Sequence, residues 1–383
     1  MQKKRCIVVA VSSLAGGGAE RVAIQLANDC KLPGLDVVLL VASDEGQYRE
    51  IIHKDVNLIT VDVPLATSRS VHFASRLRAL LKQWDPVVVI SHLTEMNRML
   101  LRCKAMGALK APIAVVDHNS MALKVEGIRG LRGQLLRWEY AYLYKKAFAV
   151  VGVSQGVLDS VQSITGTACE RGRVINNSID VSSVQEAAST KPDDGFANKL
   201  LNLPRPLVMS VGRLNWQKAY HDLIHAFAAL PSDSRGSLVI LGEGELLGEL
   251  QELTVQLDLN GAVHFPGFVK NPWWFMAQCD LFVSSSVWEG FGLVLAEAMA
   301  CGVPVISTES PGPVEVIEPG VSGVLVESGD VLRLTEEMHR CLTDESLRQS
   351  LIAGGLVRVT RFLPETTYSG YVELINDAQK GGE

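Results

Sequence analysis

The chain has 383 residues, of which 47% are apolar and 20% charged; this composition excludes wholesale disorder and suffices for two domains. Its seven cysteines form no CxxC pair or Cys/His ladder, so neither a disulfide framework nor a zinc site is expected. No apolar stretch reaches the roughly 18 residues that span a bilayer. The apolar run near the amino terminus fits a buried strand better than a signal peptide, so we expect a cytoplasmic protein.

Charge is unevenly distributed along the chain. The formal net charge is −6, yet residues 66–150 contain 14 Lys and Arg against 5 Asp and Glu. This asymmetry indicates that one face of the first half meets an anionic partner. No nucleic-acid partner is expected.

Short apolar runs rich in Val and Ile alternate with helical patterns along the chain. The runs predicted to be strands are residues 6–13, 36–43, 86–93, 111–119, 147–154, 206–214, 236–244, 262–269, 280–286 and 303–310. Continuously apolar strands are typical of parallel sheets that are buried on both faces. The alternation predicts an α/β fold with two doubly wound parallel sheets.

A polar, proline-bearing stretch at residues 181–206 interrupts this alternation and is predicted to be an interdomain linker. We therefore expect a first domain over 1–185 and a second over 205–365. The last helical stretch, 366–383, is predicted to pack back on the first domain. Two such sheets imply a cleft between them, and ligands bind at the carboxyl ends of the strands.

Three consecutive glycines, Gly16 to Gly18, follow the first strand and open a helix. Their amides could approach a phosphate, because no side chain intervenes and the helix dipole favours negative charge there. A dinucleotide-binding fingerprint is not met, since Arg21 occupies its third glycine position. A plain tight turn remains the alternative.

Asp117 and His118 stand at the end of a predicted strand and are expected to project into the cleft. A histidine there could hydrogen-bond a sugar hydroxyl, or it could be a satisfied structural group. The residues alone leave both interpretations open.

Residues 124–148 mix Arg and Lys with Leu, Trp and Tyr at helical spacing. They are predicted to form a basic amphipathic helix suited to an anionic membrane surface. Packing of the apolar stripe on the domain itself is the alternative.

Two cations, Arg213 and Lys218, follow a buried strand on a short loop ahead of a helix. At the carboxyl end of a strand they could neutralise a diphosphate, whereas an ordinary surface salt bridge is the alternative. Gly242 is predicted to lie in a turn that lines the same cleft.

Two glutamates, Glu289 and Glu297, frame an apolar stretch that is predicted to be strand, loop and helix. Buried carboxylates need partners, because an unpaired buried charge is costly. Carboxylates accept hydrogen bonds well from sugar hydroxyls, whereas the amides of Gly290, Phe291 and Gly292 at a helix N-terminus suit a phosphate. The arrangement predicts a nucleotide sugar, with Glu289 on a hexose hydroxyl and Glu297 on the ribose.

These motifs resemble those of one family. The segments GGGAER at 16–21, VGRLNWQK at 211–218, EGFGLVLAE at 289–297 and SPGPVEVIEPGVSGVLVESGD at 310–330 are similar to those of the family 4 retaining glycosyltransferases of the GT-B fold. One departure is Lys218-Ala219-Tyr220, where the family often has Lys-Gly. The resemblance covers essentially the whole chain. It implies two facing Rossmann-like domains, with the acceptor held mostly by the first and the nucleotide sugar by the second.

The resemblance also implies roles for individual residues. The catalytic roles fall to Glu289, Arg213, Lys218 and His118. The donor would be held by Gly17, Gly18, Gly242, Gly290, Phe291, Gly292, Leu293 and Glu297, and the acceptor side would include Glu20, Asp117 and Asn119. No metal or cofactor is implied, in keeping with the lack of a DxD-type carboxylate cluster.

The implied reaction is retaining transfer of a hexose or N-acetylhexosamine from a nucleotide sugar, UDP-linked by family frequency. The implied acceptor is a glycan or a polyprenyl-diphosphate-linked sugar of polysaccharide or lipopolysaccharide biosynthesis, met at the cytoplasmic face of the inner membrane. A nucleotide-sugar epimerase and a catalytically silent nucleotide-sugar-binding protein are the alternatives. A phosphorylase lacks an apparent pyridoxal phosphate motif, and an NAD-dependent dehydrogenase lacks the third glycine.

Overall fold

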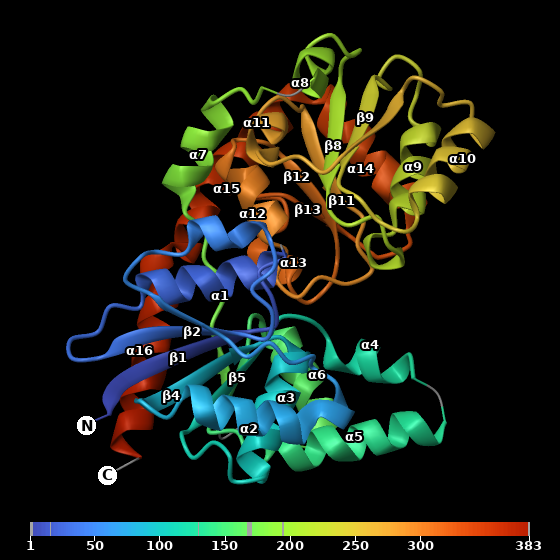
Figure 1. Ribbon diagram of the computed structural model, residues 1–383. Helices are drawn as coiled ribbons and strands as arrows, with labels where there is room; N and C mark the ends of the chain where they lie inside the picture. The colour runs from blue at the N-terminus through green and yellow to red at the C-terminus, as the bar shows by residue number, and fades with distance from the viewer. Residues whose placement is uncertain (1–2, 16, 129, 167–170, 194, 382–383) are drawn as a thin grey trace. The chain divides into compact units, whose positions relative to one another are not determined.

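The computed structural model describes the chain except for residues 1–2, 16, 129, 167–170, 194 and 382–383. The chain divides into two compact units, one formed by Met1–Ser178 with Glu365–Glu383 and the other by Ile179–Pro364. Each unit contains one parallel sheet with helices packed against it (Figure 1). The prediction of an α/β fold with two doubly wound sheets is confirmed.

The first unit has, among its described residues, seven parallel strands in the order β3-β2-β1-β4-β5-β6-β7. Their bounds are β1 Lys4–Val11, β2 Asp36–Val41, β3 Asn57–Thr60, β4 Trp84–His92, β5 Ile113–Asp117, β6 Ala149–Gly152 and β7 Gly172–Val174. The helices are α1 Gly18–Asp29, α2 Ser70–Leu80, α3 Thr94–Ala105, α4 Met121–Glu126, α5 Leu131–Tyr144, α6 Gln155–Thr165 and α16 Pro364–Lys380. All five residues of β5 are buried, as expected for a strand covered on both faces.

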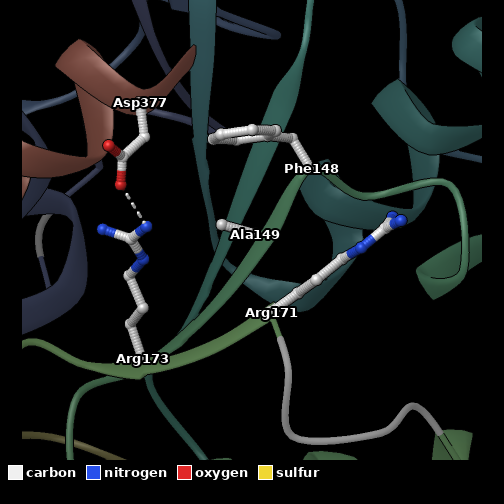
Figure 2. Close-up of a pocket in the computed structure, with 5 residues that line it drawn as sticks. All are labelled: Phe148, Ala149, Arg171, Arg173 and Asp377. Atoms are coloured by element: carbon white, nitrogen blue, oxygen red, sulfur yellow. Dashed lines mark hydrogen bonds and ion pairs between the residues drawn. The ribbon is translucent and has the colours of Figure 1, made fainter. Parts of the chain in front are cut away.

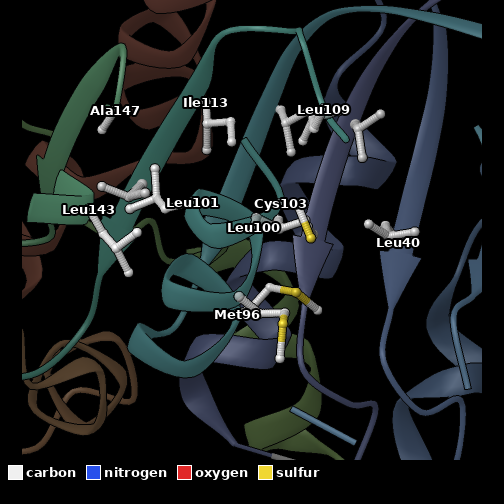
Figure 3. Packing of buried hydrophobic residues seen from close by; sticks show 14 of the residues in the cluster. Leu40, Met96, Leu100, Leu101, Cys103, Leu109, Ile113, Leu143 and Ala147 are labelled. Atoms are coloured by element: carbon white, nitrogen blue, oxygen red, sulfur yellow. The ribbon is translucent and has the colours of Figure 1, made fainter. Parts of the chain in front are cut away.

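Apolar packing fixes α3 against this sheet, and Figure 3 shows part of that core. Met96 and Leu100 of α3 and Ile113 of β5 are all 0% exposed. The first turn of α3 therefore has a fixed position at the carboxyl edge of the sheet. It presents Thr94 and Asn97 there, next to the end of β5.

The second unit has, within its described residues, six parallel strands in the order β10-β9-β8-β11-β12-β13. They are β8 Leu207–Val211, β9 Ser237–Leu241, β10 Val263–Gly267, β11 Leu281–Ser284, β12 Val305–Thr308 and β13 Val324–Val326. The helices are α7 Val181–Ser189, α8 Gly195–Leu200, α9 Tyr220–Ala229, α10 Leu247–Gln256, α11 Pro272–Met276, α12 Leu293–Ala300, α13 Pro313–Val316, α14 Val331–Thr343 and α15 Glu345–Val359.

Both sheets reverse their winding direction once. β1 lies beside β4 in the first sheet, and β8 lies beside β11 in the second, although each pair is far apart in the chain. At such a crossover point the loops after the two strands diverge to opposite faces, and ligands bind at the carboxyl ends of the strands. The loops after β8 and β11 are therefore the places to look for a site.

The stretch 181–206, which we expected to be a linker, forms α7 and α8 and belongs to the second unit. Its apolar residues are few but buried, with Val184 at 2% and Leu200 at 0% exposed. The Asn271 amide also donates a hydrogen bond to the Ala187 carbonyl at 2.8 Å. The first unit thus ends at Ser178 and not at residue 185, while α16 packs on it through an Arg173–Asp377 ion pair.

Residues 124–148, which we expected to form one helix, form parts of α4 and α5 instead. α4 ends at Glu126, and α5 begins at Leu131 after Gly130, whose φ of 74° lies in the left-handed region that favours glycine. None of the helices in the described part of the chain is long and apolar enough to cross a membrane.

The loops after β8 and β9 meet through glycine backbone. The Gly212 amide donates to the Leu241 carbonyl at 2.9 Å, and Gly242 has a φ of 134°. A Cβ added at Gly242 would lie 2.0 Å from the Gly212 carbonyl oxygen. Only glycine allows the two loops to approach this closely.

We predict that Gly242→Ala destabilises the protein by roughly 2 to 4 kcal/mol, because it adds both backbone strain and a clash with backbone. The midpoint of chemical unfolding measures the change. The control is Gly248→Ala in α10, where an added Cβ meets nothing within 4 Å. A Gly242→Ala midpoint equal to that of the control would contradict the steric argument.

Candidate active site

An ion pair between Lys218 and Glu289 forms the centre of the site in the second unit. Lys218 ends a short 3-10 helix, Trp216–Lys218, on the loop after β8, and Glu289 lies on the loop after β11. Because these strands are neighbours, Lys218 Nζ reaches Glu289 Oε1 and donates a hydrogen bond at 2.5 Å. The two side chains are only 16% and 11% exposed. The buried carboxylate thus has the charged partner that burial requires.

Hydroxyl groups complete the surroundings of Glu289. Ser286 donates to the same Oε1 at 2.7 Å, and the Glu289 amide donates to Ser310 Oγ at 3.1 Å. Ser285 donates to the Lys218 carbonyl at 2.8 Å. In the part of the chain that the structure describes, these side-chain contacts of Glu289 all involve Oε1, and no donor reaches Oε2. Sequence reasoning missed these serines, although Ser284 to Ser286 follow one another at the end of β11.

The loop that carries Glu289 leads into α12. Gly292 is the N-cap of this helix, with a φ of 86°, and Leu293 is its first residue. Phe291 is 3% exposed and packs edge-on against Phe362, with ring centroids 5.2 Å apart. The amides of Gly290 to Gly292 therefore stand on a rigid loop at a helix N-terminus, where partial positive charge favours a phosphate.

Three other predicted donor residues lie in the same unit. Arg213 is exposed on the loop after β8, five positions before Lys218. Glu297 is 8% exposed, and it lies just over one turn inside α12, not the two turns that we expected. Gly242 allows the loops after β8 and β9 to approach closely. The structure gives the positions of these three residues, and their contacts with a donor stay predictions.

In the first unit, Asp117 is fully buried at the end of β5. The Tyr144 hydroxyl donates to its Oδ2 at 2.9 Å, and Thr94 and Asn97 donate to its Oδ1 at 3.2 and 3.4 Å. Burial raises the pKa of Asp117 to about 6, against the lowering effect of these donors. The Asp117 carboxylate is therefore enclosed within the first unit. Its direct contact with an acceptor stays a prediction.

His118 pairs with a second buried histidine, His92, which sequence reasoning missed. His92 Nδ1 and His118 Nε2 are 3.0 Å apart, so one imidazole donates to the other. His92 is the last residue of β4, which neighbours β5 in the sheet. The polar residues of the segment SHLTEMN at 91–97, at the end of a predicted strand, could have indicated it. Burial lowers the pKa of His118 to about 4 and that of His92 well below its usual range. Both rings are therefore neutral at pH 7.

The remaining predicted residues of the first unit lie at the starts of α1 and α4. Gly17 is the N-cap of α1, and a Cβ there would lie 2.4 Å from Glu20 Oε2, so the Glu20 carboxylate covers this glycine. Gly18 and Asn119 are exposed. Gly16 lies outside the described residues.

A cavity of about 400 Å³ lies at the opposite, amino edge of the first sheet (Figure 2). Arg173 pairs with Asp377 there at 2.6 Å, whereas Arg171 points away from that pair and donates to the Ala147 carbonyl. The cavity is thus separate from the predicted site residues of this unit. No group of three or more His, Cys, Asp or Glu suited to a metal ion occurs among the residues with described positions.

Comparison with known proteins finds glycosyltransferase families that match both units. The profile of the family described as Glycosyltransferase Family 4 matches residues 16–183, and that of Glycosyl transferases group 1 matches 193–356. The chain is 29% identical over 350 residues to the N-acetylgalactosamine-N,N'-diacetylbacillosaminyl-diphospho-undecaprenol 4-alpha-N-acetylgalactosaminyltransferase of Campylobacter jejuni, covering 89% of this chain and 91% of that protein.

Two further matches agree. The chain is 36% identical over 171 residues to the lipopolysaccharide core biosynthesis glycosyltransferase LpsE of Rhizobium meliloti, which covers 44% of this chain and 49% of that protein. The crystal structure of Anabaena HepE with UDP and glucose superposes with a TM-score of 0.81 at 21% identity, covering 98% and 100% of the two chains.

Two Rossmann-like parallel sheets and these matches define a glycosyltransferase with the GT-B fold. The chain belongs to the family 4 glycosyltransferases, since the two family profiles match most of each unit, at residues 16–183 and 193–356. The resemblance of its motifs to the family 4 glycosyltransferases of the GT-B fold is confirmed, whereas retention of configuration and the residue roles stay predictions.

The buried imidazole of His118 predicts a pH dependence of stability. Its folded-state pKa of about 4 lies below the ordinary 6.5, so the unfolded chain binds the proton first as the pH falls. The contribution to stability is complete above pH 6.5 and is lost as the pH falls towards 4. Asp117, with a raised pKa, acts in the opposite direction, with stability lost as the pH rises through about 6.

When the pH is lowered from 7 to 5, we expect the free energy of unfolding to fall less in His118→Gln than in the wild type. The difference between the two falls should be about 2 kcal/mol. Urea midpoints at the two pH values measure this difference. The control is His72→Gln in α2, whose imidazole is exposed and keeps its hydration on folding. An identical pH dependence for His118→Gln and wild type would show that the His118 ring is not held neutral.

Proposed function

We propose that this glycosyltransferase transfers a hexose or N-acetylhexosamine from a UDP-linked donor, with retention of anomeric configuration. The proposed acceptor is a glycan or a polyprenyl-diphosphate-linked sugar in cell-surface polysaccharide or lipopolysaccharide biosynthesis. The observation that carries the proposal is the Lys218–Glu289 pair at the crossover point of the second sheet, with Glu289 Oε2 left for a ligand.

The relatives support the choice of substrates. The Campylobacter jejuni protein is named for a diphospho-undecaprenol-linked acceptor and for transfer of N-acetylgalactosamine, and LpsE for lipopolysaccharide core biosynthesis. The structural neighbour HepE contains UDP and glucose. HepE supports the choice of a UDP-sugar donor, and the two relatives support a lipid-linked or lipopolysaccharide acceptor.

In the proposed reaction, the bond between the anomeric carbon and the diphosphate breaks first. Negative charge then develops on the leaving UDP, where the Lys218 ammonium, the Arg213 guanidinium and the N-terminus of α12 stabilise it. Such preorganised charges act most strongly where charge develops in the transition state. The acceptor hydroxyl attacks the oxocarbenium-like sugar from the same face, and its proton passes to the departing phosphate oxygen.

Glu289 positions the sugar and is not a general base in this scheme. Its Oε1 is engaged by Lys218 and Ser286, whereas Oε2 is available to accept a hydrogen bond from a hexose hydroxyl. Glu297 takes the ribose of the nucleotide. In the first unit, the proposal assigns His118 to the transferred sugar and Gly17 with Gly18 to the diphosphate.

The proposal includes no metal or cofactor, since cationic side chains would stabilise the leaving group. It places the protein in the cytoplasm, in peripheral contact with the inner membrane through the basic 124–148 segment. An epimerase would convert the donor without an acceptor, and a silent binding protein would bind it without turnover. Product analysis with and without acceptor separates these alternatives.

We expect Glu289→Gln and Lys218→Ala each to lower turnover about a hundredfold, because each removes one preorganised contact with the sugar or the leaving group. Steady-state transfer to a soluble acceptor analogue measures the effect, and the unfolding midpoint of each variant verifies folding. The matched control is Glu336→Gln, which removes one side of the exposed Arg333–Glu336 ion pair in α14. Near-normal turnover for both site variants would remove the site assignment.

We also expect UDP-sugars to raise the unfolding temperature more than GDP- or ADP-sugars do. At about 100 times its dissociation constant a donor adds about 2.7 kcal/mol to stability. Transfer should persist in EDTA, and proton NMR should show a product with the anomeric configuration of the donor. Loss of turnover in EDTA would refute the metal-free scheme, and an inverted product would refute retention.

A further inference from the structure

Two histidines form a buried pair at the carboxyl edge of the first sheet. His92 is the last residue of β4, and His118 directly follows β5, which is the neighbouring strand. The two residues are 0% and 7% exposed, and their ring centroids are 5.3 Å apart. One nitrogen of each ring takes part in the contact, His92 Nδ1 and His118 Nε2, and these two atoms are 3.0 Å apart.

The second nitrogens of the two rings have different surroundings. His92 Nε2 is buried and has no hydrogen-bond partner among the described residues. The His92 ring also lies against the buried ring of Tyr371 in α16, with centroids 6.3 Å apart. His118 keeps part of its surface exposed, and in the described part of the chain only its Nε2 has a hydrogen-bond partner. The pair is therefore closed on the side of His92 and more open on the side of His118.

The two tautomers of the pair are coupled. Both rings are neutral at pH 7, because burial lowers the pKa of each imidazole. A neutral imidazole carries one N–H, on either Nδ1 or Nε2, and only one of the two facing nitrogens can donate in the contact. If His92 Nδ1 donates, the proton of His118 lies on its Nδ1. If His118 Nε2 donates, the proton of His92 lies on its Nε2.

The enclosed Nε2 of His92 distinguishes these two arrangements. A proton on it would be a buried N–H without an acceptor, and such groups are rare because they lose their hydration and gain no bond in return. Buried acceptors that lack a donor are tolerated somewhat more often. The arrangement in which His92 Nδ1 donates to His118 Nε2 is therefore the favoured one.

No carboxylate replaces His92 as the partner of His118. Asp117 precedes His118 in the chain, but among the described residues its hydrogen bonds come from Tyr144, Thr94 and Asn97. A carboxylate against an imidazole would favour the charged ring, whereas a second neutral imidazole does not. The contact with His92 thus orients the His118 ring without making it a stronger base.

We propose that His92 is a positioning residue that holds His118 in the tautomer protonated at Nδ1. His118 then offers a neutral N–H donor to a substrate oxygen and not a basic lone pair. Such a donor suits a hydroxyl or ring oxygen of a sugar, but it cannot remove the proton of an acceptor hydroxyl. This inference rests on the proposed function for the identity of the substrate, and it deepens that function by giving His118 a defined role.

Proton–nitrogen correlation NMR of the full chain with isotope-labelled histidines tests the tautomer without any substrate. Long-range correlations within the ring distinguish a protonated Nδ1 from a protonated Nε2, and the signals missing from His118→Gln identify this residue. At pH 7 we expect wild-type His118 to be protonated at Nδ1. His92→Leu should abolish this single tautomer, because it removes the donor to Nε2. His92→Asn should keep it, because the asparagine amide supplies an N–H close to the position of Nδ1.

Steady-state kinetics of the proposed transfer test the positioning role. His92→Leu should lower kcat about tenfold, which corresponds to one neutral hydrogen bond. The KM for the donor should stay within about twofold, because His92 is enclosed and the lost contact acts through His118. His92→Asn should restore kcat to within about threefold of the wild type. A merely structural role for His92 would not link kcat to the tautomer of His118.

The matched control is His72→Leu in α2, the same substitution at an exposed imidazole. It should leave the His118 signals and the turnover unchanged. Unfolding midpoints verify that each variant folds. If His92→Leu does not fold, the wild-type spectrum and His92→Asn still decide the question.

Two outcomes would overturn the proposal. One is a wild-type His118 that is protonated at Nε2. The other is that His92→Leu leaves both the His118 tautomer and kcat as in the wild type, or that His92→Asn and His92→Leu lower kcat equally while the tautomer is unchanged in both.

The proposed function fails in a different way. A wild type with His118 protonated at Nδ1 that transfers no sugar from any UDP-sugar would refute the proposed function alone. One that transfers sugar with His118 protonated at Nε2 would refute the positioning role of His92 alone.

Discussion

The buried carboxylate of Glu289 requires a cation, and the winding of the second sheet supplies one. β8 and β11 are neighbours only because the sheet reverses direction between them, and their following loops bring Lys218 against Glu289. Ser286 and Ser310 then anchor the glutamate to the surrounding loops. The buried carboxylate is thus held by one cation and one hydroxyl through a single oxygen. The proposed role of Glu289 as a ligand of the donor sugar rests on that arrangement.

The first unit solves the same problem of a buried acid in a different way. No cation among the described residues pairs with Asp117; Tyr144, Thr94 and Asn97 provide neutral donors, and burial raises the pKa of Asp117 in spite of them. The neighbouring His92–His118 pair is neutral for the same reason. Apolar packing of α3 fixes two of these donors, so the polar network at the carboxyl edge depends on the core beneath it. The two units thus combine an ionic site in one with a neutral, hydrogen-bonded network in the other.

The basic character of the first half has two components that the structure separates. Several of its cations are used internally: Arg102 and Lys124 pair with glutamates, and Lys104 donates to the carbonyls of Lys110 and Ala111. Arg132, Lys145 and Lys146, in α5 and directly after it, have no carboxylate within 4.0 Å among the described residues. The positively charged surface is therefore smaller than the number of Lys and Arg residues suggests. It lies next to exposed apolar side chains of α5, so the outer face of this helix is both apolar and basic.

The sequence alone determined the fold class, the central strands and the family, because buried parallel strands are continuously apolar and the glutamate and lysine motifs are local. It missed β3, β7 and β13, which are short edge strands that carry less apolar sequence. The prediction of a linker at residues 181–206 was wrong, because α7 and α8 have few apolar residues and only the tertiary structure shows which surfaces these residues cover. Pairings were decided by tertiary structure: Lys218 and Glu289 are 71 positions apart, and His92 and His118 are 26 apart. Strand order brings such residues together, and no local pattern records which strands become neighbours.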